Sequence, residues 1–293
     1  MTHLQLLQTV IGGSRKIFEG WIMTIDNPEL PEFAYYDSYD RFARRVRGES
    51  RYATDTASRA FIATVLATAP ARLLTIREGQ IFYRAQPGIS ENEWEDEDGA
   101  MRIETSGHGP ERMVPRPELV TGGRTNAAGI AYLYLATSTL TAISEIRPWI
   151  GAPVSVAQFK TKRVLQALDL SRGHGAPGFT KLTFDQLLGN DLMDAATKQE
   201  VVWTDIDNAF SRPVSRSDEG IEYVPTQVLA EAFVGAGYEA IAYRSSFGDP
   251  GYNVVLFDIN DAEILNCTPY TVRKLEIEFE SNGNVWFRHN RNK

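Results

Sequence analysis

The segment from Gly123 to Gly151, GRTNAAGIAYLYLATSTLTAISEIRPWIG, constrains the fold more than any other part of the sequence. Its core, IAYLYLAT, is apolar and rich in residues that favour β-structure, so it predicts a buried strand. The next residues, STLTAISEIR, start with hydroxyl side chains that can cap a helix and stop before Pro148. We therefore expect a strand followed by a short helix, with Arg124 ahead of the strand and Glu145 on the helix.

Two other segments place polar side chains at the ends of β-prone runs. IFYRAQ follows a polar REGQ turn and contains Arg84, and YEAIAYRSSFGDPGYNVVLFD has Ser245 between two apolar runs. The order along the chain is thus arginine, glutamate, serine. On spacing alone, a charge pair such as Arg124 with Glu145 is more often a solvated or structural pair than a catalytic one.

These segments resemble the RES family, which is named for those three residues. The matching pieces are IFYRAQ, GRTNAAGIAYLYLATSTLTAISEIR, YVPTQVLAEAF and YRSSFGDPGYNVVLFD, over roughly residues 80–270. Their GR, LYLA and AISE elements recur together in that family. The resemblance implies an NAD-consuming toxin with an α+β fold like that of ADP-ribosyltransferases, in which helices flank a mixed β core.

The resemblance also implies a site for NAD. Its catalytic residues would be Arg84, Glu145 and Ser245, and its NAD-contacting residues Arg84, Arg124, Tyr134, Asn126, Ser245 and Gln227. Arginine suits the diphosphate because its planar fork donates two parallel hydrogen bonds and stays charged. An ionised glutamate can stabilise the positive charge that develops on the ribose as nicotinamide departs.

The charged candidates also have ordinary structural explanations. Arg84 and Arg124 could form surface ion pairs with any of the many carboxylates. Glu145 could lie on a helix surface and pair with Arg147 or Lys160. Spacing does not decide between these roles and the functional ones.

The neutral candidates leave similar alternatives open. Tyr134 shares a sheet face with Tyr132, and core packing is the commoner role for such a tyrosine. Asn126 and Gln227 could serve only to cap turns. Ser245 lacks the G-x-S-x-G elbow of a serine hydrolase, so we expect its hydroxyl to hydrogen-bond ribose, phosphate or Glu145 rather than act as a nucleophile.

The implied reaction splits nicotinamide from NAD and passes ADP-ribose to inorganic phosphate or water, as an NAD phosphorylase or an NAD glycohydrolase does. A protein ADP-ribosyltransferase stays open, because every acceptor attacks the same cationic carbon. A catalytically idle nucleotide-binding module is the alternative of another class. The resemblance further implies a cognate helix-turn-helix antitoxin as a partner protein.

Composition limits the size of the core, the kinds of partner and the cellular compartment that we expect. With 293 residues, 43% of them hydrophobic, the chain can bury one good core. A net charge of -8 without any Lys/Arg run argues against nucleic acid as a direct partner. No membrane span or signal peptide is evident, and the single Cys267 suits a reducing compartment, so we expect a cytoplasmic protein. The four scattered histidines predict no metal site.

The expected domains are a helical N-terminal extension over residues 1–75 and the NAD-binding catalytic domain over residues 76–293. Residues 31–70 predict two helices, with apolar stripes formed by Tyr35, Tyr39, Phe42 and Val46, and by Phe61, Ile62, Val65 and Leu66. The acidic run SENEWEDEDG, between Arg84 and Arg124, has no periodicity and predicts a solvated loop. A lid over the site is the less favoured alternative.

The rest of the chain alternates between strands and helices. VSVAQF, RVLQALDL, YEAIAY, YNVVLFD and AEILNCT predict strands, and TFDQLLG, KQEVVWTDIDNAF and PTQVLAEAFVGAG predict helices. LEIEFESNGNVWFR predicts a hairpin around Asn282-Gly283.

Overall fold

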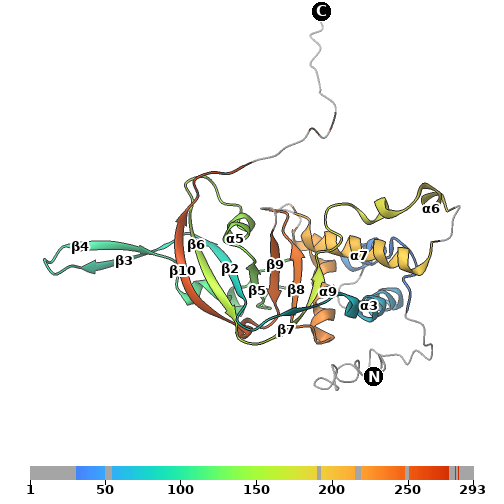
Figure 1. Cartoon of the computed structure of the whole chain (residues 1–293), viewed down its shortest axis with the longest axis horizontal. Coiled ribbons are helices and arrows are strands. Elements are labelled where there is room, and N and C mark those ends of the chain that lie inside the picture. The colour runs from blue at the N-terminus through green and yellow to red at the C-terminus, as the bar shows by residue number, and fades with distance from the viewer. Residues whose placement is uncertain are drawn as a thin grey trace, which may run out of the picture.

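The computed structural model describes residues 31–49, 55–189, 193–214, 219–247 and 251–276, together with Ser281 and Gly283. One large mixed sheet and a group of helices form the α+β architecture that the sequence predicts (Figure 1). The strands of the hairpin expected around Asn282 lie mostly outside the described residues.

The large sheet has eight strands in the order β1-β7-β8-β9-β5-β2-β6-β10. Their bounds are β1 Leu73–Ile76, β2 Ile81–Pro87, β5 Leu133–Ala136, β6 Pro153–Thr161, β7 Leu165–Leu170, β8 Ala240–Arg244, β9 Tyr252–Leu256 and β10 Ala262–Thr271. Only β7 and β8 pair in parallel among these strands. The central strands β8 and β9 are buried along most of their length, which explains why their sequences read as continuous apolar runs.

Several helices carry the start and stop signals seen in the sequence, whereas α4 and α8 were not predicted. They are α2 Ser38–Gly48, α3 Thr56–Thr68, α4 Pro110–Met113, α5 Thr139–Glu145, α6 Phe184–Leu188, α7 Ala195–Ser211, α8 Glu219–Glu222 and α9 Val224–Gly235. The Ser138 side chain caps α5 by accepting a hydrogen bond from the Thr141 N–H at 3.1 Å. Pro225 lies in the first turn of α9, and Gly237 follows that helix with a φ of 88°. No described helix is both long and apolar enough to cross a membrane.

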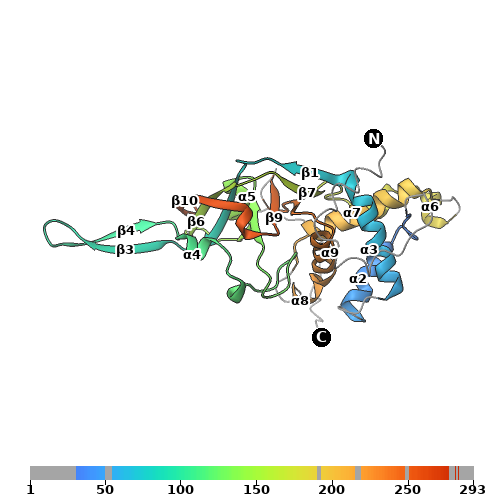
Figure 2. The ribbon, with the colours of Figure 1, turned by 90° about the horizontal axis from the view of Figure 1, so that it is seen from below.

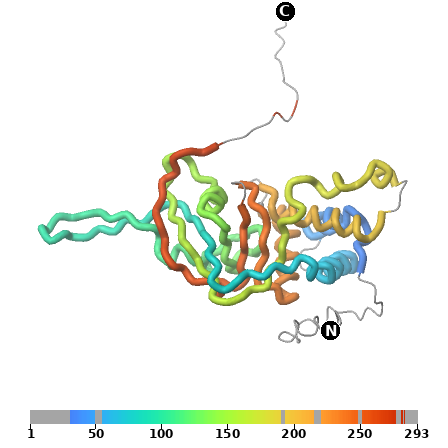
Figure 3. The backbone as a smooth tube through the Cα atoms, in the orientation of Figure 1, coloured from blue at the N-terminus to red at the C-terminus, as the bar shows by residue number. Residues whose placement is uncertain are grey.

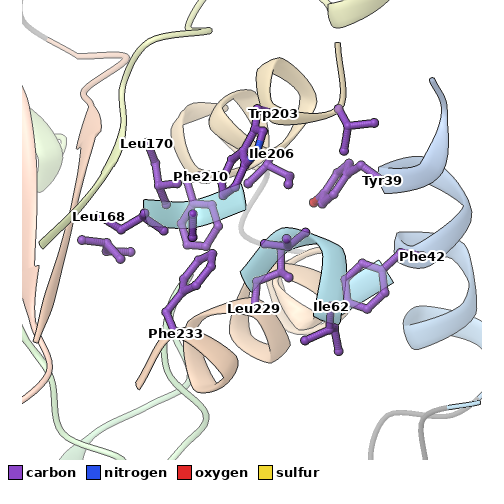
Figure 4. Close-up of a cluster of buried hydrophobic side chains, with 14 of the residues drawn as sticks. Tyr39, Phe42, Ile62, Leu168, Leu170, Trp203, Ile206, Phe210, Leu229 and Phe233 are labelled. Carbon is purple, nitrogen blue, oxygen red and sulfur yellow. The ribbon is translucent and has the colours of Figure 1, made fainter. Parts of the chain in front are cut away.

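Helices α2, α3, α7 and α9 gather at one end of the molecule and share a single hydrophobic core with the sheet (Figures 1 and 2). In Figure 4, side chains from α2 and α3 meet those of α7, α9 and β7. Within this core the ring centres of Phe42 and Phe61 lie 4.7 Å apart in a stacked arrangement. Tyr35, expected on the first helix, precedes α2 and is 54% exposed. The two N-terminal helices therefore complete a core that they share with α7, α9 and the sheet rather than building one of their own.

A buried ion pair ties the segment after α3 to α7. Arg72 Nη1 donates to both carboxylate oxygens of Asp207, at 2.7 and 2.9 Å, and the Arg72 guanidinium lies 4.4 Å from the Trp203 ring centre. The Gly173 N–H donates to the same carboxylate at 2.7 Å. Burial raises the pKa of Asp207 to about 6, although the charge of Arg72 opposes that rise.

The prediction of a solvated loop over SENEWEDEDG is wrong. Ser90–Glu95 (β3) and Met101–Ser106 (β4) form an antiparallel hairpin, and Asp96 caps its turn by accepting the N–H groups of Asp98 and Ala100. The hairpin projects from the end of the sheet opposite the helices (Figures 2 and 3). Both of its faces are exposed, so it lacks the apolar alternation that marks a strand packed on a core.

Candidate functional site

Glu145 lies at the C-terminal end of α5, the helix that follows β5 directly. Its Oε1 atom accepts two short hydrogen bonds, from Ser245 Oγ at 2.6 Å and from Asn253 Nδ2 at 2.6 Å. Neither Arg147 nor Lys160 pairs with it: Arg147 stacks on Phe247, and Lys160 bonds Glu263. The carboxylate is thus fixed at one oxygen by neutral donors, and within the described residues no hydrogen bond reaches its second oxygen.

Glu145 is one of the three partners that sequence reasoning left open for Ser245, whereas Asn253 was not predicted. The Ser245 hydroxyl also lies 2.6 Å from the Phe247 carbonyl oxygen, and one hydroxyl hydrogen cannot serve both acceptors at once. Asn253 is 6% exposed and stands in β9 opposite Tyr243 of β8. The available signal was the amide side chain of Asn253 in the otherwise apolar run YNVVLF, because a buried polar group needs a partner.

Tyr134, Asn126 and Gln227 hold the loop that enters β5. The Tyr134 hydroxyl donates to Asn126 Oδ1 at 2.6 Å and accepts from the Thr125 N–H at 3.1 Å. Gln227 Nε2 donates to the carbonyls of Gly123 and Asn126 at 2.7 and 3.0 Å. The Asn126 amide donates to the carbonyls of Thr121, Ala127 and Ile130. Asn126 and Gln227 therefore shape the wall of the site through hydrogen bonds to the chain itself.

Gly123 cannot carry a side chain in this loop. A Cβ atom there would lie 2.7 Å from Asn126 Oδ1 and 2.8 Å from the Tyr134 hydroxyl, both too close. The glycine of the GR element thus allows the loop to approach the buried phenol. Burial raises the pKa of Tyr134, so its hydroxyl stays protonated at neutral pH.

Both arginines of the predicted site lack an ion pair with any described carboxylate. Arg84 on β2 is half-buried; its Nη1 donates to the Tyr134 carbonyl at 3.0 Å, whereas its buried Nε has no hydrogen-bond partner. Burial lowers the pKa of Arg84 to about 10, so it remains cationic at neutral pH. Arg124 Nη1 donates to the Ala209 carbonyl at 2.8 Å, and its guanidinium lies 5.0 Å from the Tyr223 ring centre. Each cation is held in place by neutral groups and can still receive an anion.

Two neighbouring cavities lie among these residues, although neither Ser245 nor Gln227 lines them. The smaller, about 290 Å³, is lined by Arg124, Tyr134, Glu145, Arg147, Tyr223 and Phe247 among others. The larger, about 840 Å³, is lined by Arg84, Gln86, His108, Arg112, Arg116 and Tyr134 among others. Gly122, Gly123 and Tyr134 line both, so the two cavities meet along one wall. Glu145 therefore faces an aromatic chamber, and Arg84 faces a wider cationic one.

Arg147 is a further residue that sequence reasoning did not place in the site. It adopts a φ of 48°, the only left-handed non-glycine conformation among the described residues, and its guanidinium lies 4.7 Å from the Phe247 ring centre. Strained backbone of this kind is often found at functional sites. Within the part of the chain that the structure describes, no group of His, Cys, Asp and Glu side chains could hold a metal ion.

Known proteins similar to this chain include a protein family and a solved structure. A family model for the RES domain matches residues 100–279, more than half of the chain. Among solved structures, a chain in the crystal structure of the M. tuberculosis MbcT–MbcA toxin–antitoxin complex is 15% identical, with a TM-score of 0.35, over 71% of this chain and 92% of that chain. None of the curated proteins matches.

Proposed function

The chain belongs to the RES domain family, and from this membership and the geometry around Glu145 we propose that it is an enzyme that cleaves NAD between nicotinamide and ribose. The observation that carries the proposal is a carboxylate whose one oxygen is fixed by Ser245 and Asn253 while it faces a cavity beside Arg124 and Tyr134. A surface glutamate would not need two buried donors.

In this proposal the nicotinamide ribose occupies the smaller cavity. As the glycosidic bond breaks, positive charge builds up on the ribose, and the ionised Glu145 stabilises it more in the transition state than in the ground state. The hydrogen bonds from Ser245 and Asn253 hold Oε1, which leaves Oε2 to contact the ribose. The rings of Tyr134, Tyr223 and Phe247 offer surfaces on which nicotinamide can stack.

The diphosphate is assigned to the arginines. Arg84 and Arg124 approach the Tyr134 wall from the two cavities, and neither has a carboxylate partner among the described residues. A half-buried guanidinium without a counterion is stabilised by a bound anion, which offsets the loss of its hydration. The remaining adenosine half then lies in the larger cavity.

The acceptor of the ADP-ribose is the less constrained part of the proposal. We assign inorganic phosphate or water as the acceptor, which makes the protein an NAD phosphorylase or an NAD glycohydrolase. A phosphate ion could use a donor of Arg124 or Arg147, since both guanidinium groups line the cavity of Glu145. Transfer to a protein side chain is the alternative of the same chemistry.

A toxin role and a partner protein complete the proposal. The family resemblance implies a toxin that depletes NAD and a cognate helix-turn-helix antitoxin that neutralises it. Expression of the protein alone in a bacterial host should stop growth and lower cellular NAD. Continued growth with unchanged NAD, although the protein is made in folded form, would argue against the toxin role.

The reaction itself is tested by incubating the purified protein with NAD, with and without phosphate. Chromatography should detect free nicotinamide, and phosphorus NMR should identify the second product. A ribose-1-phosphate type product, formed faster as phosphate is raised, indicates phosphorolysis, and plain ADP-ribose indicates hydrolysis. Labelled ADP-ribose on a protein band would indicate the transferase. Intact NAD after long incubation would leave only nucleotide binding.

A further inference from the structure

We propose that Arg112 and Arg116 bind a phosphate monoester carried by the adenosine half of the dinucleotide, so that the protein cleaves NADP as well as NAD. This inference rests on the proposed function and extends its substrate class. It starts from the larger cavity, which has a volume of about 840 Å³ and a cationic lining. The cavity beside Glu145 is much smaller, at about 290 Å³.

The two cavities divide the dinucleotide. Glu145 lines only the smaller one, and Arg84 lines only the larger one, while Tyr134 lines both. If the nicotinamide ribose contacts Glu145, the chain of atoms that crosses the Tyr134 wall is the diphosphate. The group that then enters the larger cavity is the adenosine with its ribose hydroxyls.

The larger cavity is cationic in an otherwise acidic protein. Three arginines line it, Arg84, Arg112 and Arg116, against the single lining carboxylate of Glu111. The whole chain, by contrast, has a net charge of -8. Arg84 accounts for the diphosphate, so two cations remain that neutral adenosine does not require.

Both remaining arginines can still bind an anion. Arg112 Nη2 donates to the Pro87 carbonyl at 3.1 Å, and no described carboxylate forms an ion pair with Arg112. Arg116 Nε lies 4.0 Å from a Glu118 oxygen, and both side chains are more than half exposed. Such an exposed, distant pair contributes little, so it does not compete with a dianionic phosphate.

The segment that carries these arginines is held in place. Pro110 and Pro117 begin the two short helical turns of this segment, α4 and the 3-10 helix Pro117–Leu119. Proline fixes φ at such positions. Met113, one residue after Arg112, is completely buried in the core against the sheet. Arg112 therefore projects from an anchored turn rather than from a mobile loop, which lowers the entropy cost of binding.

The test measures NAD and NADP side by side. Binding is measured by calorimetry in the Glu145→Gln background, which prevents turnover, and cleavage is measured with the otherwise unchanged protein. Each assay uses Arg112→Ala, Arg116→Ala, the double variant and the control Arg102→Ala. Arg102 lies on the hairpin and pairs with Asp96, outside both cavities.

We expect NADP to bind at least as tightly as NAD to the parental site. The double variant should bind NADP about 10-fold or more weakly, since hydrogen bonds to charged groups are the strong ones, while NAD binding changes little. Arg102→Ala should change neither. Loss of the NADP preference without loss of NAD binding also excludes simple unfolding.

Three results would overturn the inference. In the first, the protein binds and cleaves NAD but neither binds nor cleaves NADP, and the proposed function stays intact. Another is an NADP to NAD ratio that the double variant does not change. The third is a double variant that instead needs more inorganic phosphate to reach its half-maximal rate, because Arg112 and Arg116 would then serve the co-substrate. If neither dinucleotide binds, the proposed function fails as well.

Discussion

Asn253 and Glu145 come from distant parts of the chain, yet the amide Nδ2 of Asn253 lies 2.6 Å from Glu145 Oε1. Asn253 is buried in β9, so its position is set by the sheet, whereas Glu145 ends a short helix and is exposed to the cavity. The bond therefore transmits the rigidity of the sheet to the carboxylate. Ser245 supplies a second donor, but its hydroxyl has the Phe247 carbonyl as an alternative acceptor.

Removing the fixed donor should lower the rate of catalysis more than it lowers NAD affinity. For Asn253→Ala we expect kcat to fall by about 10-fold to 100-fold, because a charged acceptor loses its buried partner, with KM changed little. Ser245→Ala should cost less, and Asn253→Asp should cost most because a second carboxylate would face Glu145. Initial rates at saturating and limiting NAD separate these effects. A parental kcat for Asn253→Ala would remove Asn253 from the positioning role.

The arginines should act on binding first. Arg84→Ala and Arg124→Ala should each weaken NAD binding by about 10-fold or more, because each removes charge-assisted hydrogen bonds to the diphosphate. Arg84→Lys keeps the charge and loses the planar fork, so its affinity for NAD should lie between those of the parental protein and Arg84→Ala. Calorimetric titration in the Glu145→Gln background gives these affinities without turnover. Parental affinity in both alanine variants would contradict the assignment of the diphosphate.

The hairpin should be dispensable for the reaction. It projects away from the sheet, and the residues between Ser90 and His108 line neither cavity. Replacing residues 92–104 by an Asn-Gly turn should keep the strand pairing short and leave NAD cleavage within about 2-fold of the parental rate. The lid alternative requires the opposite result. A shortened protein that folds normally by circular dichroism but loses activity would support the lid.

The ion pair between Arg72 and Asp207 should support stability, since its acid is fully buried. Arg72→Ala leaves that carboxylate unpaired, and we expect a loss of about 3–5 kcal/mol in the free energy of unfolding. Urea unfolding measures it, with Arg44→Ala on the exposed face of α2 as the control. A loss no larger than that of the control would show that the pair contributes nothing.

The same variant should respond to pH in a definite direction. Burial has already raised the pKa of Asp207 to about 6, above its ordinary value of 3.8, and removing the cation raises it further. A group with a raised folded pKa favours folding most below its unfolded pKa, and this contribution is lost as pH rises through the folded pKa. The loss in free energy of unfolding caused by Arg72→Ala should therefore shrink as pH falls from about 8 to about 5. A loss that grows over this range would contradict the assignment.

Local patterns predicted the parts of the fold that local physics controls. The unit β5–α5 follows from the apolar LYLA run and the capping Ser138, although the strand is shorter than IAYLYLAT. The buried stripes of α2 and α3 follow from helical spacing. The hairpin β3–β4 was not predicted, because its cross-strand pairs, such as Glu93 with Ile103, face solvent and its sequence has no apolar alternation.

For the candidate site, the sequence offered candidate residues but not the hydrogen-bond partners that the fold gives them. A family resemblance singles out three residues: Arg84 within β2, Glu145 at the end of α5, and Ser245 just after β8. Asn253 contacts Glu145 only because the sheet order sets β9 between β5 and β8, a long-range pairing that no short motif contains. The joining of two cavities along Tyr134 is likewise a product of tertiary packing.

The central claim is that Glu145 stabilises the cationic ribose as NAD is cleaved. Nicotinamide release from NAD, followed over time for the parental protein and for Glu145→Gln, tests it most directly, with calorimetry to show that both proteins bind NAD. We predict steady release by the parental protein and a rate at least about 100-fold lower for Glu145→Gln with NAD binding retained. Equal rates in the two proteins, or no release by a parental protein that binds NAD, would contradict the account.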